Sequence, residues 1–173
     1  MREALKATPL VFCAVVLQGS WFSALSVGRG GAGFLLVTIV SLALLRGSVF
    51  GATAGFLAGL AYDISVYQRL GLTSLLLTLA GFWTGRYGET TGRDRAHAPY
   101  LAVFVITILY EFGATCVRFL LGETVSLTVV LIHTLPGEAL LNLALTAPVY
   151  ALCRWAVGRR GEESRSVEVK LIG

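Results

Sequence analysis

Long apolar runs, separated by short polar stretches, dominate this chain of 173 residues. A run of about 20 apolar residues is long enough to cross the hydrocarbon core of a bilayer as a helix. The pattern therefore predicts an all-α membrane protein, a bundle of six transmembrane helices. The predicted spans are residues 7–26, 31–46, 48–66, 71–86, 99–121 and 136–156.

The segments between the spans are short. Arg46 and Gly47 separate the second span from the third, which predicts a tight helical hairpin. Residues 87–98 form the one clearly polar loop, and Pro99 fits the first turn of the span that follows. Segment 124–135 is apolar but too short to cross, so it is predicted to be a half-helix or an interfacial stretch.

The distribution of positive charge predicts the orientation, because cytoplasmic loops are enriched in Lys and Arg. With the N-terminus in the cytoplasm, eleven of the 14 Lys and Arg residues lie inside, and only Arg29, Arg69 and Arg118 lie outside. A seventh span at 124–135 would remove this bias. Six spans with both ends inside are therefore expected: residues 1–157 form one transmembrane domain, and residues 158–173 form a short charged cytoplasmic tail.

Composition agrees with a lipid environment and argues against several function classes. Hydrophobic residues make up 55% of the chain and charged residues 14%, against about 25% charged residues in soluble domains. The basic residues that give the net charge of +4 are scattered, so nucleic acid is not an expected partner. His97 and His133 are predicted on opposite sides of the membrane, and the three cysteines lie in apolar runs. No catalytic group, cofactor or metal is expected.

Glycines recur every four residues along the third predicted span, and an aspartate follows at the same interval. The fourth span repeats the spacing more weakly. Small residues at this spacing allow helix backbones to approach closely. Two interpretations stay open, namely packing within the bundle and a docking groove for a helix of another protein. The residues concerned are Gly47, Gly51, Gly55, Gly59 and Asp63, with Gly81 and Gly85 in the fourth span.

Several polar residues fall inside the last two predicted spans. Glu111 lies near the middle of its span, and Arg118 follows seven residues later on nearly the same face. Since an ionised group in the membrane core needs a partner, Arg118 is expected to pair with Glu111 or Asp63. A structural role, a proton or ion relay and a partner contact all remain open. Asn142 could hydrogen-bond across helices, and Pro148 is expected to kink the last span.

The second to fourth spans carry a recognisable combination of motifs. Leu45-Arg46-Gly47 ends one apolar run, Gly55 and Gly59 lead at four-residue steps to Asp63, and Leu70-Gly71 follows. With Asn142, Pro148 and Tyr150 in the last span, the chain resembles the MreD family of bacterial rod shape-determining membrane proteins. The resemblance implies a bundle similar to the S components of energy-coupling-factor transporters.

The same resemblance implies a function. It suggests a non-catalytic, multi-pass scaffold of the cell-elongation machinery in the bacterial cytoplasmic membrane, supporting lateral peptidoglycan synthesis and cell shape. The implied partner is MreC and, through it, the glycosyltransferase RodA, a class B penicillin-binding transpeptidase and the filament protein MreB.

A different class of function also fits the predicted bundle. In a substrate-binding S-like component of a vitamin transporter, Asp63, Glu111, Arg118 and Asn142 would line a cavity that opens outward. The sequence shows few clustered aromatic and polar residues of the kind that such a pocket needs. The scaffold is therefore the preferred interpretation.

Overall fold

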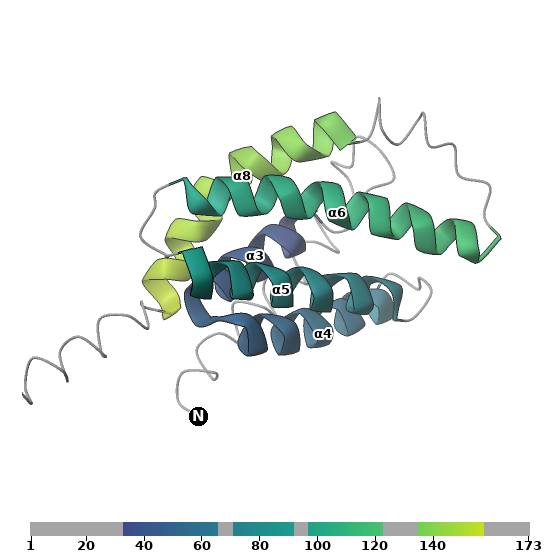
Figure 1. Cartoon of the computed structure of the whole chain (residues 1–173), viewed down its shortest axis with the longest axis horizontal. Helices are drawn as coiled ribbons and strands as arrows, with labels where there is room; N and C mark the ends of the chain where they lie inside the picture. Colours follow the sequence, from purple (N-terminus) through teal and green to yellow (C-terminus); the bar gives the residue numbers. More distant parts are fainter. Residues whose placement is uncertain (1–32, 66–70, 92–96, 123–134, 158–173) are drawn as a thin grey trace, which may run out of the picture.

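Five α-helices make up the described part of the chain, residues 33–65, 71–91, 97–122 and 135–157, in this computed structural model (Figure 1). The first predicted span, all of segment 124–135 except Leu135, and the tail lie outside the described residues. The other five predicted spans each correspond to one helix. The helices are α3 (Gly33–Arg46), α4 (Ser48–Ser65), α5 (Leu72–Thr91), α6 (Ala98–Leu120) and α8 (Leu135–Val157).

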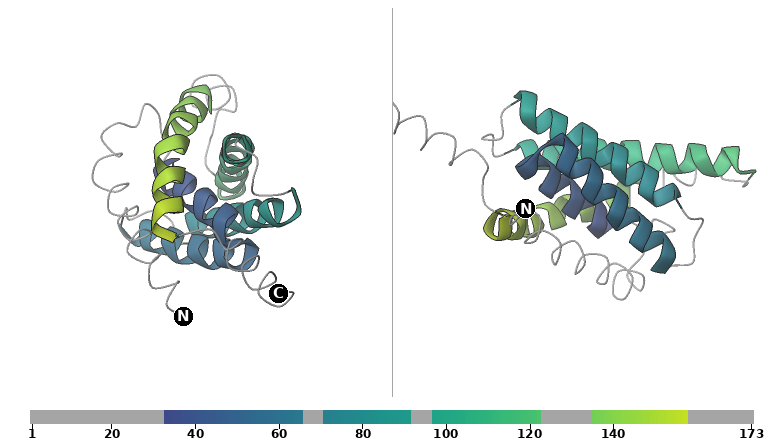
Figure 2. Two further views of the ribbon diagram at one scale, coloured as in Figure 1. Left: turned by 90° about the vertical axis from the view of Figure 1, so that its left-hand side faces the viewer. Right: turned by 90° about the horizontal axis from the view of Figure 1, so that it is seen from below.

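Helix α3 lies among the other four described helices, as the end-on view shows (Figure 2, left). Every residue from Leu35 to Leu45 is buried. A helix that is apolar on all sides is suited to such a position, because no face has to meet water. With 14 residues, α3 is about 21 Å long at 1.5 Å per residue, shorter than a full span. It serves as the core around which α4, α5, α6 and α8 pack.

Three glycines sit at helix ends in the left-handed backbone region. Gly47 (φ 99°) joins α3 to α4, Gly71 (φ 97°) precedes α5, and Gly122 (φ 80°) follows α6. A side chain is disfavoured at such φ values, so glycine allows each reversal of direction. The tight hairpin expected at Gly47 is therefore confirmed. Pro99 lies in the first turn of α6, also as expected.

Helix α5 continues through Thr91, five residues beyond the predicted end of its span. The prediction that residues 87–98 form a loop is thus wrong in its first part. The physical reason is that the polar residues of this last turn have a partner. Glu89 bonds to the start of α4, so the turn is stabilised although it is not apolar.

The outward surfaces of the bundle are apolar. Helix α6 and residues Leu135–Trp155 of α8 are each long and apolar enough to cross a membrane, whereas α3 is apolar but shorter. Large apolar side chains point away from the protein on every outer helix, which suits contact with lipid or with another helix. They include Val49, Leu57, Leu75, Trp83, Phe104, Phe112, Phe119, Leu140 and Trp155. A six-span bundle with both ends inside stays a prediction.

Candidate functional site

The glycines of α4 and α5 lie at one shared interface, where the two helices run antiparallel and side by side (Figure 1). A Cβ added to Gly51 would lie 2.5 Å from the carbonyl oxygen of Gly81. One added to Gly55 would meet the backbone of Leu77, and one added to Gly59 would meet Ser74. None of these positions has room for a side chain. We call this interface the glycine seam.

Two further contacts complete the glycine seam. Gly85 lies against the backbone of Ser48 at the start of α4. Near the other end, the Ser74 hydroxyl donates a hydrogen bond to the Phe56 carbonyl at 3.0 Å. Close backbone contact and hydrogen bonds between helices are the main attractive forces available where lipid replaces water. The seam therefore fixes α4 and α5 as one unit.

Of the two interpretations of the glycine pattern, the structure agrees with packing within the chain, because the glycines of α4 contact the backbone of α5. The face of α4 that a partner helix would need is covered by α5. Gly47 forms the turn after α3, and its backbone lies against Gly85 at the end of the seam.

A carboxylate closes the glycine seam at each end. The backbone N–H of Ser48, the first residue of α4, donates to Oε1 of Glu89 at 2.8 Å, and the Ser48 hydroxyl also bonds to this carboxylate. At the opposite end, the N–H of Gly71 donates to Oδ2 of Asp63 at 2.8 Å. Gly71 accepts the first backbone bond of α5, from Leu75. Each helix thus supplies an acid to the N-terminus of the other.

These two bonds have a common physical basis. The first N–H groups of a helix have no partner within the helix, and the helix dipole makes this end partly positive. Asp63 is fully buried, so its carboxylate can stay there only if such a partner offsets the loss of water. Sequence reasoning singled out Asp63 but missed Glu89, because residue 89 was expected in a loop.

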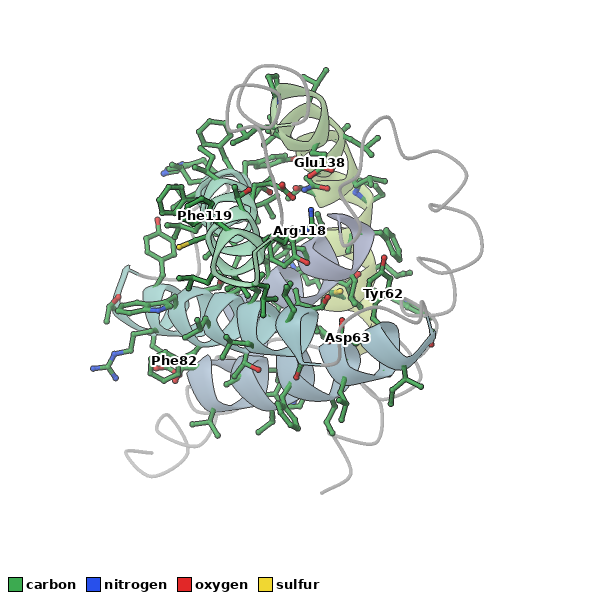
Figure 3. The ribbon with its side chains drawn as sticks, turned by 90° about the vertical axis from the view of Figure 1, so that its right-hand side faces the viewer. Tyr62, Asp63, Phe82, Arg118, Phe119 and Glu138 are labelled. Carbon is green, nitrogen blue, oxygen red and sulfur yellow. The ribbon has the colours of Figure 1, made fainter. Side chains whose placement is uncertain are left out.

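A second polar group lies between the C-terminal half of α6 and the first turn of α8. Glu138 of α8 lies close to Glu111 and Arg118 of α6, near enough for its carboxyl group to interact electrostatically with both. In Figure 3, Arg118 and Glu138 lie together between these helices, and Asp63 lies apart from them on α4. The expected ion pair of Arg118 with Glu111 or Asp63 stays a prediction, and the acid that the structure places near Arg118 is Glu138.

Glu138 is the residue that sequence reasoning missed here. It lies in the first turn of α8, inside the predicted span 136–156. An acid within a span needs a partner. This rule drew attention to Glu111, and it applied equally to Glu138.

Asn142 joins the same two helices closer to the core. It is 2% exposed, and its Nδ2 donates to the Thr107 hydroxyl of α6 at 3.1 Å. A Cβ on Gly33 would lie 2.6 Å from Oδ1 of Asn142, so α3 also approaches at this point. The expected hydrogen bond across helices is confirmed. Pro148 lies inside α8, and Figure 1 shows this helix bent along its length, as expected from a proline that removes a backbone bond.

The residues proposed for a transporter cavity do not form one group. Glu111 and Arg118 are brought together with Glu138, and Asn142 packs next to them through Thr107. Asp63 is occupied with the turn before α5. Tyr110 of α6 lies between the two regions, close to Thr73 at the start of α5 and to Glu111. The arrangement holds helices together at this end of the bundle.

The described cysteines and histidine form no metal centre. Cys153 is buried and Cys116 is exposed, and the described residues contain no cluster of three potential metal ligands. Cys13 and His133 lie outside the described residues.

Comparison with known proteins finds a family match over most of the chain, including the glycine seam and the polar residues of α6 and α8. The family model described as rod shape-determining protein MreD matches residues 8–156. The cell shape-determining protein MreD of Streptococcus pneumoniae (strain ATCC BAA-255 / R6) is 31% identical over 88 residues, which are 50% of this chain. The matched region spans 53% of that relative, about half its length. No solved structure matches the chain, so a likeness to transporter S components stays a prediction.

Proposed function

Because this chain belongs to the MreD family of cell shape-determining proteins, we propose that it is a non-catalytic scaffold of the bacterial cell-elongation complex. It spans the cytoplasmic membrane with six helices and keeps both ends inside. It supports lateral peptidoglycan synthesis by holding other membrane proteins in place.

The observation that carries this proposal is a contrast between two parts of the bundle: its small and polar residues make contacts between helices of the chain, whereas its outward surfaces are apolar. The glycine seam and both polar groups are used between helices of the same chain. The outward surfaces of the described helices instead present large apolar side chains. Such a bundle recognises partners by contact of helix against helix within the bilayer.

MreC is the proposed direct partner, and it connects the scaffold to RodA, a class B penicillin-binding transpeptidase and MreB. Because the glycine seam is closed by α5, the span of MreC must dock on an outward face. Of the two helices that are long and apolar enough to cross a membrane, α8 is the less buried: 22% of its apolar stretch is buried, against 39% in α6. Leu140 is 73% exposed near its outer end and offers an apolar contact. We place MreC against this face.

Co-purification from membranes tests the docking face. Leu140→Trp adds bulk on α8, and Leu57→Trp adds the same bulk on α4, where the leucine is 64% exposed. Loss of a well-packed anchor costs about 2 kcal/mol or more, so bound MreC should fall more than about tenfold in Leu140→Trp. Leu57→Trp should retain it. Retention in both variants would exclude the α8 face, and no MreC with the unaltered chain would exclude MreC as a direct partner.

A further inference from the structure

A groove lies between the first turn of α6 and the last turns of α8, at the end of the bundle opposite Asp63 and Glu138. Its volume is about 550 Å³, which lies within the 300–1,000 Å³ usual for small-molecule sites. Pro99 and Tyr100 line it from α6, and Tyr150, Ala151, Arg154 and Trp155 line it from α8. The polar groups and the glycine seam described above take no part in it.

The groove has a positive character. The exposed Arg154 lies at its end, and none of the described residues that line it is acidic. The N-terminus of α6 adds a partial positive charge, and its N-cap residue His97 makes no side-chain capping bond. The phenol groups of Tyr100 and Tyr150 can donate hydrogen bonds. A ligand with a negatively charged, oxygen-rich group matches this lining.

Apart from Thr146, the remaining lining is apolar. Ala147 and Ala151 extend the groove along α8 toward the middle of the helix. Trp155, 85% exposed, and Tyr100 are of the types that gather at the level of lipid headgroups. The groove therefore combines a positive end at the membrane surface with an apolar floor within the membrane.

We propose that this groove binds one anionic phospholipid, with the phosphate on Arg154 and the start of α6, and an acyl chain along Ala147 and Ala151. The assignment of this lipid to the inner leaflet rests on the orientation given in the proposed function. The groove and its binding of lipid do not depend on that orientation. Anionic lipid would fill the gap between α6 and the bent end of α8 and hold the two helices together.

Native mass spectrometry of the purified chain in neutral detergent tests the proposal. The probes are palmitoyl-oleoyl phosphatidylglycerol and phosphatidylcholine with the same acyl chains. One molecule of phosphatidylglycerol should bind about tenfold more tightly, because the choline cation of phosphatidylcholine cancels the net negative charge that Arg154 and the start of α6 would attract. Arg154→Gln should remove this preference, whereas Arg154→Lys should keep most of it. Glycerol phosphate, which lacks acyl chains, should not compete.

Two further variants make the result specific. Arg86→Gln removes an exposed arginine from the same end of the bundle but outside the groove, and should leave binding unchanged. Ala151→Trp should fill the groove and weaken both lipids. Equal binding of the two lipids, equal effects of Arg154→Gln and Arg86→Gln, or competition by glycerol phosphate would each overturn the proposal. So would an Ala151→Trp variant that loses bound MreC but keeps its lipid, because the groove would then belong to a protein helix.

Discussion

Gly55 and Gly137 show how differently one residue type acts in this chain. A Cβ on Gly55 would meet the backbone of Leu77, whereas a Cβ on Gly137 would meet nothing within 4 Å. Both glycines lie in helices, where alanine is intrinsically preferred by about 1 kcal/mol. Only at Gly55 does the space between two backbones require the absence of a side chain.

We therefore expect Gly55→Ala to lower the free energy of unfolding by about 1–3 kcal/mol, because the added methyl group overpacks the seam. Gly137→Ala should be neutral or slightly stabilising. Denaturation in mixed micelles with increasing SDS, followed by circular dichroism, measures both. Equal stability of the two variants would show that the glycine seam does not limit the packing of α4 on α5.

Asp63 is the second residue whose role can be isolated. Its carboxylate accepts the Gly71 N–H at the start of α5, so Asp63→Ala should cost about 0.5–2 kcal/mol of unfolding free energy. Asp63→Asn keeps an acceptor oxygen and should cost less. Thr90→Ala is a suitable control, because that hydroxyl bonds only within its own helix. The same SDS titration applies, and an Asp63→Ala variant as stable as Thr90→Ala would contradict this role.

At the scale of helices, the sequence was sufficient to predict the five described elements, because apolar length and glycine or proline at the ends define them locally. Gly47 and Pro99 marked boundaries that the structure confirms. The end of α5 was not predictable in this way. Its last turn is stabilised by the hydrogen bond that the Ser48 N–H donates to Glu89, 41 residues away, and local composition carries no information about such a contact.

The polar groups were predictable as individual residues but not as partnerships. Asn142, Glu111 and Arg118 stood out because polar groups within spans are costly. Which of them meet depends on the rotation of α6 against α8, and that rotation is set by packing along both helices. Asp63 was therefore considered as a partner of Arg118, although it bonds to its own turn at Gly71.

The bond between Asn142 and Thr107 should measure how strongly α6 and α8 are coupled. A double-mutant cycle with Asn142→Leu and Thr107→Val should give a coupling of about 0.6 kcal/mol, up to about 1.7, as for other hydrogen bonds between membrane helices. Pairing Asn142→Leu with Thr78→Val should give no coupling, since the Thr78 hydroxyl bonds to Ser74 within α5. Zero coupling in the first cycle would mean that the bond does not join the helices.

For the whole molecule, the charge distribution and the antiparallel helices lead to one orientation. The C-terminal ends of α5 and α6 lie at opposite ends of the bundle (Figure 1); Thr90 lies in the last turn of α5, and Leu121 directly follows α6. In a variant whose three native cysteines are replaced by serine, a membrane-impermeant maleimide should label Leu121→Cys in intact cells. It should label Thr90→Cys only after the membrane is opened. The reverse pattern would invert the proposed orientation, and labelling of both from outside would exclude it.

The shape of the bacterium tests the proposed function most directly. Depletion of this chain from its own cells should lower their aspect ratio, measured by phase-contrast microscopy, as elongation fails. The unaltered chain and Gly137→Leu should restore elongated cells, whereas Gly55→Leu should not, because it separates α4 from α5. Cells that stay elongated without the chain would contradict its role in cell shape.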